Sequence, residues 1–124
     1  MAREMKVPGP DHPITIKPSS DRVTVRAGGK TVADSTATLV LQEADYPAAR
    51  YIPLADVDQA LLAPSNTTTY CPYKGDASYW SITADPERGE DAVWFYPEPR
   101  PAVGEIRDHV SFYTDRVEIT VEPA

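Results

Sequence analysis

Hydrophobic and polar residues alternate with a period of two along several short stretches of this chain, which is the pattern of half-buried β-strands. The clearest stretch is residues 22–26, where valines alternate with arginine and threonine, and Gly28-Gly29 follows it. Two glycines supply the positive φ angles that a two-residue hairpin turn requires. The pattern therefore predicts a hairpin in which residues 22–26 pair with residues 30–35.

This hairpin gives one carboxylate an unusual predicted position. With Gly28-Gly29 as the turn, Val25 faces Val32 and Val23 faces Asp34 on the same side of the sheet. Asp34 would then lie at the end of an apolar face. A carboxylate in such a place needs hydrogen-bond partners or a functional role.

Further strand-like stretches follow the hairpin, separated by turn signals rich in proline, glycine and aspartate. They lie at residues 38–43, 50–53, 67–70, 78–82, 92–96, 109–113 and 116–121. Apolar residues at helical spacing predict two short helical or 3₁₀ segments, at residues 55–62 and 103–110. Turns at this spacing are typical of an all-β sandwich or barrel. We therefore expect a mainly β, compact single domain, sandwich-like or barrel-like, with one or two short helices.

Length and the N-terminal residues set the expected boundaries. A chain of 124 residues is large enough for one domain with one hydrophobic core. Residues 1–13 are polar and carry three prolines, so a loose N-terminal arm is expected, with residues 14–124 forming the single β domain. The N-terminus lacks the apolar segment of a signal peptide, and no apolar run approaches the roughly 20 residues of a membrane span. We expect a cytoplasmic protein.

Charge and cysteine content exclude several classes of function. The net charge of −7 gives an acidic surface that repels phosphate backbones, so no nucleic-acid partner is expected. The single cysteine excludes an internal disulfide and a four-cysteine zinc site. His12 and His109 are isolated in the sequence, and no metal site is expected from them.

Reactive and rigid groups are concentrated in residues 70–80, with the sequence YCPYKGDASYW. An ammonium near a thiol favours the thiolate, which makes Cys71 a candidate nucleophile beside Lys74. The alternative for Cys71 is a small buried hydrophobic residue. Lys74 is a candidate contact for a phosphate or carboxylate, and the alternative is that Lys74-Gly75 only shapes a turn.

Aromatic side chains on or beside the predicted strands are candidates for stacking on a planar ligand. Alternation sends Tyr79 and Trp80 to opposite faces, and likewise Trp94 and Phe95, so one member of each pair is expected in the core. The aromatic residues assigned to the ligand site are Tyr51, Tyr73, Tyr79, Trp80, Trp94 and Tyr96.

Carboxylates of the first half of the chain form a third group of candidates. Asp34 and Glu43 are expected in a buried polar network that includes Lys74. Asp56 and Asp58 have the spacing of paired metal-binding carboxylates in nucleotidyl transfer. On a helix, however, residues two apart point about 200° apart, and no phosphate-binding loop precedes them. Acidic residues at a helix start are the favoured interpretation.

Gly28-Gly29-Lys30-Thr31 has the end of a phosphate-loop motif, but the position of the first required glycine is Val25. A hairpin turn explains these glycines without a nucleotide.

Several motifs after residue 12 are shared with a known family. They are Val32-Ala33-Asp34-Ser35, Glu43, Tyr51-Ile52-Pro53 with Asp56-Val57, Cys71-Pro72-Tyr73-Lys74-Gly75, Ala77-Ser78-Tyr79-Trp80, Ala92-Val93-Trp94 with Tyr96 and Pro99, and Phe112-Tyr113 with Arg116-Val117. Through them the chain resembles a widespread bacterial domain family of unknown function catalogued under a nucleotidyltransferase label. The resemblance implies a β fold of the Mss4-like or β-tent kind, in which some relatives hold a small ring in an aromatic cage. Several β-tent relatives carry a four-cysteine zinc site, which one cysteine does not allow here.

Three functions follow as hypotheses. The leading one is a small β domain that binds a small, planar, anionic ligand without a cofactor, in an aromatic-lined pocket around the CPYKG motif and through Lys74. The second, implied by the family label, is a nucleotidyltransferase-like enzyme that acts on nucleotides, with Lys74 on a phosphate and Asp34 or Glu43 as acid–base groups or Mg²⁺ ligands. The third is a structural or interaction homodimer that pairs through exposed strand edges.

Overall fold

The computed structural model describes residues 5–123, which form ten β-strands in two antiparallel sheets. The larger sheet has the order β1 (Ile14–Ser19), β4 (Thr38–Glu43), β5 (Ala49–Pro53), β9 (His109–Phe112), β8 (Val93–Phe95), β7 (Gly75–Ile82) and β6 (Leu62–Cys71). The smaller sheet has the order β10 (Glu118–Glu122), β2 (Arg22–Ala27) and β3 (Lys30–Ser35). The expectation of a mainly β single domain is confirmed.

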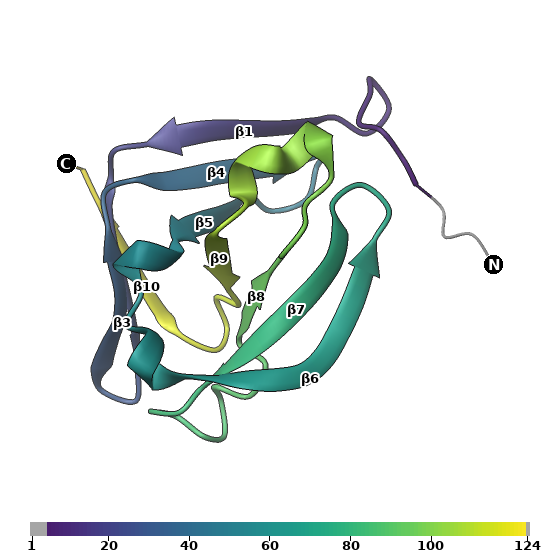
Figure 1. Cartoon of the computed structure of the whole chain (residues 1–124). Coiled ribbons are helices and arrows are strands. Elements are labelled where there is room, and N and C mark those ends of the chain that lie inside the picture. The colour runs from purple at the N-terminus through teal and green to yellow at the C-terminus, as the bar shows by residue number, and fades with distance from the viewer. Residues whose placement is uncertain (1–4, 124) are drawn as a thin grey trace.

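The two sheets meet at a corner where the chain leaves one sheet for the other. In Figure 1 β1 and β4 run across the top, and the chain turns downward from β1 into β2 and returns through β3 to β4. The larger sheet begins with β1 and ends with β6, and these two strands do not pair with each other. The fold is therefore not a closed barrel.

Three short 3₁₀ segments connect the strands, η1 (Leu54–Asp56), η2 (Gln59–Leu61) and η3 (Pro101–Ile106). The first two occupy the predicted helical stretch 55–62. The third begins earlier than predicted, because Pro101 stands at its first turn, where a proline is preorganised for a helix. Residues 109–112 then form β9, as predicted for the stretch 109–113, so the helical spacing that included Val110 does not continue into this strand.

The β2–β3 hairpin has the predicted turn but not the predicted register. Gly28 and Gly29 adopt φ angles of 57° and 77°, as a two-residue turn requires. A bulge between Val25 and Arg26 then shifts the pairing by one residue, so that Thr24 pairs with Asp34. A shift of one residue moves a side chain to the opposite face of a strand. Asp34 consequently lies on the exposed face, and its predicted position at the end of an apolar face is wrong.

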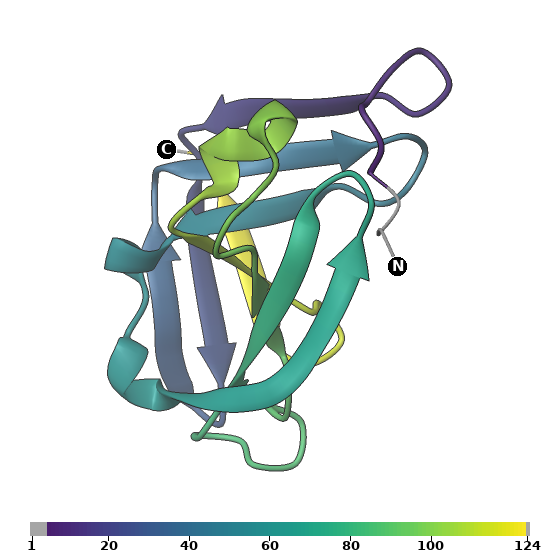
Figure 2. The ribbon, with the colours of Figure 1, turned by 45° about the vertical axis from the view of Figure 1, so that its right-hand side comes forward.

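Two clusters of buried side chains form the hydrophobic core. The first lies between the sheets and includes Val23, Val25, Val32, Ile52, Ile82, Val93, Val110 and Phe112. The second packs against η3 and includes Leu41, Tyr51, Ala77, Tyr79, Tyr96, Val103 and Ile106. Figures 1 and 2 show η3 against the β4–β5 part of the large sheet. The second cluster is rich in tyrosine, and it supports the site described below.

The described part of the N-terminal arm lies against the domain. The Lys6 N–H donates to the Pro72 carbonyl at 3.0 Å, and Gly9 forms an isolated β-bridge with His12. Residues 1–4 of the predicted arm lie outside the described residues. Within residues 5–123, no helix has the length and apolar character that crossing a bilayer requires.

The loop between β7 and β8 has no room for a side chain at Gly89. A Cβ atom there would lie 2.4 Å from the Ile82 carbonyl oxygen and 2.5 Å from that of Asp85. We expect Gly89→Ala to lower the free energy of unfolding by about 1–3 kcal/mol, because backbone atoms would have to shift. Urea unfolding measures the loss. Gly104→Ala is the matched control, since no atom lies within 4 Å of its Cβ position; equal losses in both variants would contradict the packing argument.

Candidate functional site

Glu43, the last residue of β4, is the centre of a group of three hydrogen-bonded side chains. Its Oε1 accepts a hydrogen bond from Lys74 Nζ at 2.6 Å, and its Oε2 accepts one from His12 Nε2 at 2.7 Å. All three side chains are largely buried: Lys74 is 13% exposed, Glu43 is 11% exposed and His12 is 20% exposed. Both carboxylate oxygens of Glu43 are therefore satisfied in a largely buried position.

Strand pairing and one tight turn bring these three residues together. β1 pairs with β4 so that Ile14 lies opposite Glu43, which places His12, just before β1, beside that carboxylate. Lys74 lies in the turn between β6 and β7, where its N–H donates to the Cys71 carbonyl at 3.3 Å. Gly75 ends this turn with a φ of 111°, a backbone conformation that residues other than glycine rarely adopt. The glycine of the CPYKG motif thus allows the turn that presents Lys74.

The pKa values of the pair are shifted in opposite directions, so that both groups stay charged. Burial raises the pKa of Glu43, but the hydrogen bonds from Lys74 and His12 outweigh it and leave the pKa below its ordinary value. Burial lowers the pKa of Lys74, but the hydrogen bond to Glu43 outweighs it and leaves the pKa above its ordinary value. Lys74 is therefore an ammonium at neutral pH. It is suited to attract an anion and unsuited to attack as a free amine.

Aromatic rings pack against His12 and Lys74 and hold both side chains in place. The His12 ring stacks on Tyr73 with ring centroids 4.0 Å apart and planes 5° apart. Tyr46 meets the same histidine edge-on at 5.9 Å. Lys74 Nζ lies 5.7 Å from the centroid of the Tyr96 ring. A cation over an aromatic face is attracted by the ring quadrupole, so these rings favour the charged lysine.

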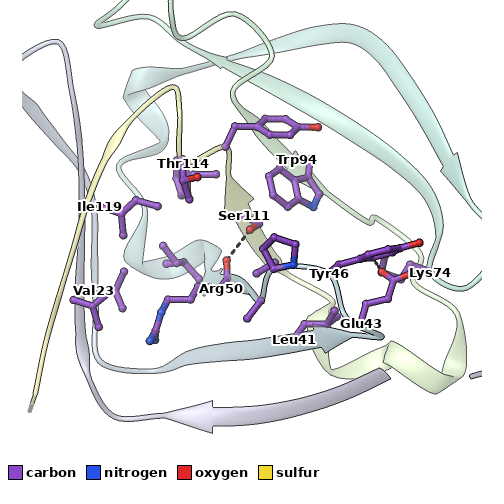
Figure 3. A pocket seen from close by; sticks show the side chains of 17 residues that line it. Val23, Leu41, Glu43, Tyr46, Arg50, Lys74, Trp94, Ser111, Thr114 and Ile119 are labelled. Carbon is purple, nitrogen blue, oxygen red and sulfur yellow. Dashed lines mark hydrogen bonds and ion pairs between the residues drawn. The ribbon is translucent and has the colours of Figure 1, made fainter. Parts of the chain in front are cut away.

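A pocket of about 590 Å³ opens beside the ion pair (Figure 3). Glu43 and Lys74 lie at one end, and Val23 and Ile119 lie at the other end. Arg50 and Ser111 lie between them, and the Ser111 hydroxyl donates to the Arg50 carbonyl at 2.7 Å. Trp94 and Thr114 line the opposite side. Tyr113 also lines the pocket, and its ring contacts Trp94. The pocket therefore lies between the two sheets and has its charged groups at one end and along one side.

The charged residues that line this pocket are Glu43, Lys74 and Arg50, which sum to a charge of +1. The chain as a whole carries −7. Among the described residues, the Arg50 guanidinium has long contacts, 3.4 Å to Thr38 Oγ1, 3.5 Å to Ser19 Oγ and 4.0 Å to Asp21 Oδ2. The pocket is thus a locally positive region in an acidic protein.

Of the six aromatic residues predicted for the ligand site, Trp94 lines the pocket. Tyr51, Tyr79 and Tyr96 are between 1% and 8% exposed and form a layer behind it. The Tyr51 hydroxyl accepts a hydrogen bond from Trp94 Nε1 at 3.1 Å, which fixes the orientation of the indole. These tyrosines support the pocket wall and do not themselves line it.

The structure does not place Trp80 with this site. Tyr79 and Trp94 are register partners on one face of the large sheet. Trp80 stacks on Phe95 at 4.4 Å on the other face, where both pack against the first core cluster. The predicted placement of the paired residues on opposite faces is confirmed. Both faces carry a core cluster, since Trp80 packs against the first cluster and Tyr79 belongs to the second. Tyr73 contacts His12 and also does not line the pocket.

Among the catalytic candidates, the structure joins Glu43 to Lys74 and separates Asp34 from both. Asp34 lies on the smaller sheet, where its carboxylate accepts two hydrogen bonds from Arg22, at 3.0 and 2.7 Å. The prediction that it joins Lys74 in a buried network is wrong, because the bulge in the hairpin turns it outward. Cys71 is half-buried against the second core cluster, and its thiol has no hydrogen-bond partner among the described residues. No base is therefore in place to activate it.

The carboxylates do not assemble into the metal site of nucleotidyl transfer. Asp56 accepts a hydrogen bond from Ser35 Oγ at 2.6 Å, and Asp58 accepts one from the Ala60 N–H at 3.2 Å as the cap of η2. Within residues 5–123, no three His, Cys, Asp or Glu side chains group closely enough to hold a metal ion. Two-metal phosphoryl chemistry needs such a set of oxygen ligands, and the residues present do not fit it.

Sequence reasoning missed four residues of the site, His12, Tyr46, Arg50 and Tyr113 as a pocket wall. His12 and Glu43 are 31 residues apart, and only the β1–β4 pairing brings them together. Two signals pointed to Tyr113: it lies at the end of the predicted strand 109–113, and it belongs to a motif shared with the family. Tyr46 and Arg50 carry no local pattern that marks a pocket.

Residues 15–123 match the family described as a domain of unknown function (DUF427), which carries the label NTP_transf_9. The chain belongs to this DUF427 family. The matched range includes Glu43, Lys74 and Trp94 of the site, and it begins after His12. No curated protein matches the chain.

The Glu43–Lys74 pair predicts a strong coupling between two substitutions. Lys74→Met should lower the free energy of unfolding by about 3 kcal/mol, because it leaves Glu43 buried with His12 as its remaining donor. The double variant Glu43→Gln, Lys74→Met should lose less than the sum of the two single losses. Urea unfolding of all four proteins measures the coupling. Lys17→Met, at an exposed position of β1, is the control; additive losses would contradict the ion pair.

The same pair predicts how stability depends on pH. Because the folded-state pKa of Glu43 is depressed, its stabilisation is present above its unfolded-state pKa of 4.5 and is lost as the pH falls through the folded value. Because that of Lys74 is raised, its stabilisation is complete below 10.5 and is lost as the pH rises through the folded value. The stability difference between wild type and Glu43→Gln should therefore shrink below about pH 4.5. A difference that stays constant in acid unfolding curves would overturn this assignment.

Proposed function

We propose that this DUF427 domain binds a small planar ligand with a negative charge in the pocket between Lys74 and Trp94. The observation that carries the proposal is a pocket of about 590 Å³ whose charged lining residues sum to +1, in a chain of net charge −7. Small-molecule sites have volumes of about 300–1,000 Å³, with mostly apolar walls and a few placed polar groups. This pocket has both features.

The aromatic wall supports a planar ligand. Trp94 is held by its hydrogen bond to Tyr51 and contacts the Tyr113 ring, with centroids 4.6 Å apart. Burial, and then the hydroxyl of Tyr79, raise the pKa of Tyr113 to about 12, so this hydroxyl stays neutral and does not repel an anion. A ring fixed before binding loses little conformational entropy when a ligand stacks on it.

The pocket is also lined by exposed apolar side chains. Tyr46, Tyr113 and Val121 are 54%, 40% and 43% exposed, and all three line the pocket. Exposed apolar side chains around a pocket are typical of binding surfaces. Tyr46 lies near Lys74 (Figure 3) and Tyr113 contacts Trp94, so these two rings would flank a ligand that stacks on Trp94.

The charged end supports an anionic group on that ring. Lys74 remains an ammonium and donates one hydrogen bond to Glu43. An ammonium group can donate three hydrogen bonds in all. The remaining donors can meet a carboxylate or a phosphate. The β-tent kinship expected from sequence, with relatives that hold a small ring in an aromatic cage, is part of the same proposal. The nucleotidyltransferase label of the family makes nucleotides the first class to test.

Matched ligand pairs test the proposal by quenching of tryptophan fluorescence. Each pair has the same ring with and without the charge: uridine 5′-monophosphate with uridine, and an indole carboxylate with the corresponding amide. We expect the anionic member to bind about tenfold more tightly, the worth of one charge-assisted hydrogen bond. Lys74→Gln should remove this preference, while binding of the neutral member changes little.

Two tryptophans on opposite faces of the sheet provide the control. Trp94→Phe should abolish the quenching, since Trp94 lines the pocket. Trp80→Phe should leave it intact, because Trp80 is stacked on Phe95 on the other face. The proposal fails if no probe gives saturable quenching, or if quenching survives in Trp94→Phe and is lost in Trp80→Phe.

A further inference from the structure

We propose a second binding site, for a phosphate group, in the groove that three arginines line at the end of the β2–β3 hairpin. The groove has a volume of about 210 Å³, and Arg26, Arg88 and Arg116 line it together with the Gly28-Gly29 turn. It shares no lining residue with the pocket at Lys74. The two proposals therefore stand on separate residues.

Close packing of two loops creates this groove. A Cβ atom on Gly28 would lie 2.0 Å from the carbonyl oxygen of Ala84, so the hairpin turn rests directly on the loop between β7 and β8. Figures 1 and 2 both show the end of the hairpin beside that loop. This contact brings Arg26 of β2 to the same groove as Arg88 of the loop and Arg116, which precedes β10.

Neutral acceptors hold the three guanidinium groups. Arg26 donates to Thr31 Oγ1 at 2.8 Å and to the Gly29 carbonyl at 2.9 Å. Arg88 donates to the Asp115 carbonyl at 2.6 Å. Arg116 donates to the carbonyls of Arg88 and Glu90 at 3.1 and 3.2 Å. These bonds orient the groups and leave most of their N–H donors for a ligand.

The three arginines are not neutralised by a directly contacting carboxylate, although Arg116 interacts with Asp91 at longer range. Within residues 5–123, none of them forms an ion pair with a carboxylate. Arg22, on the same strand as Arg26, shows the contrast, since its guanidinium is paired with Asp34 at 2.7 Å. Asp85 and Glu118 also line the groove, so its charged residues sum to +1.

A compact oxyanion with two charges fits this arrangement best. Guanidinium groups bind phosphate oxygens through paired N–H donors, and three of them can approach one phosphate from different sides. A groove of about 210 Å³ is smaller than the usual site of a drug-sized molecule. The acidic remainder of the chain disfavours a long polyanion such as a nucleic acid.

The glycine-rich sequence at this turn gains an explanation of its own. Gly28-Gly29-Lys30-Thr31 forms no phosphate loop, because it is the turn of a hairpin and the start of β3. Two of its groups, the Gly29 carbonyl and the Thr31 hydroxyl, instead orient Arg26. The turn thus places an arginine for the anion and does not wrap the anion in its own backbone.

The test is a titration of the full chain with inorganic phosphate at constant ionic strength, followed by amide chemical shifts in NMR. We expect saturable shifts at Gly29, Arg88 and Arg116. Arg88→Ala and Arg116→Ala should each weaken binding about tenfold or more, the worth of a charged hydrogen bond. Arg22→Ala is the matched control and should leave the dissociation constant unchanged, as should Lys74→Gln.

A variant that tightens binding guards against effects of misfolding. Glu118→Gln removes one negative charge from the groove and should lower the dissociation constant for phosphate. Glycerol 3-phosphate is titrated in parallel. If it binds more tightly than inorganic phosphate, the site is one for a phosphate ester, and if it binds more weakly, the site is one for free phosphate. The proposal is overturned if sodium acetate at equal ionic strength produces the same shifts. It is also overturned if Arg88→Ala binds phosphate as wild type does, or if Glu118→Gln binds it no more tightly.

Discussion

The ion pair between Glu43 and Lys74 ties three distant parts of the chain to one point. Glu43 ends β4, Lys74 lies in the β6–β7 turn, and His12 precedes β1. Taking two charges out of water costs several kcal/mol, and the cost is offset only when the remaining donors and acceptors are satisfied. Here both carboxylate oxygens of Glu43 have donors. The pair therefore constrains the turn and the arm as strongly as it constrains the pocket end that it forms.

Behind this pair, the tyrosine-rich second core cluster sets the shape of the pocket wall. Tyr51 is fully buried, and its hydroxyl accepts a hydrogen bond from Trp94 Nε1, so the indole is held by a hydrogen bond as well as by packing. Tyr96 lies beside the ammonium of Lys74. Residues that do not line the pocket thus decide how its lining residues are oriented. A substitution in this layer would change binding through position and not through direct contact.

The distribution of charge links the two proposed sites. A chain of net charge −7 has two concave regions whose charged residues sum to +1. In the pocket the lysine is shared with a carboxylate, so the local field is moderate and the aromatic wall contributes the remaining contacts. In the groove the arginines have neutral partners, so charge itself dominates. The first arrangement favours a ring with one anionic group, and the second favours a compact dianion.

The local pattern of the sequence determined most of the strands, the glycine turn of the hairpin and the opposite faces of Tyr79 and Trp80, because period-two alternation and positive φ angles are properties of neighbouring residues. It also made Glu43, together with Asp34, a candidate partner of Lys74. It predicted neither β1 nor the first half of β6. Tertiary structure alone decided the rest. One bulge in β3 reversed the face of Asp34, and the β1–β4 pairing brought His12 to a carboxylate 31 residues away. The order of strands in the sheets decided which aromatic residues meet the pocket and which lie behind it. These outcomes depend on contacts between distant segments, whose geometry no local spacing encodes.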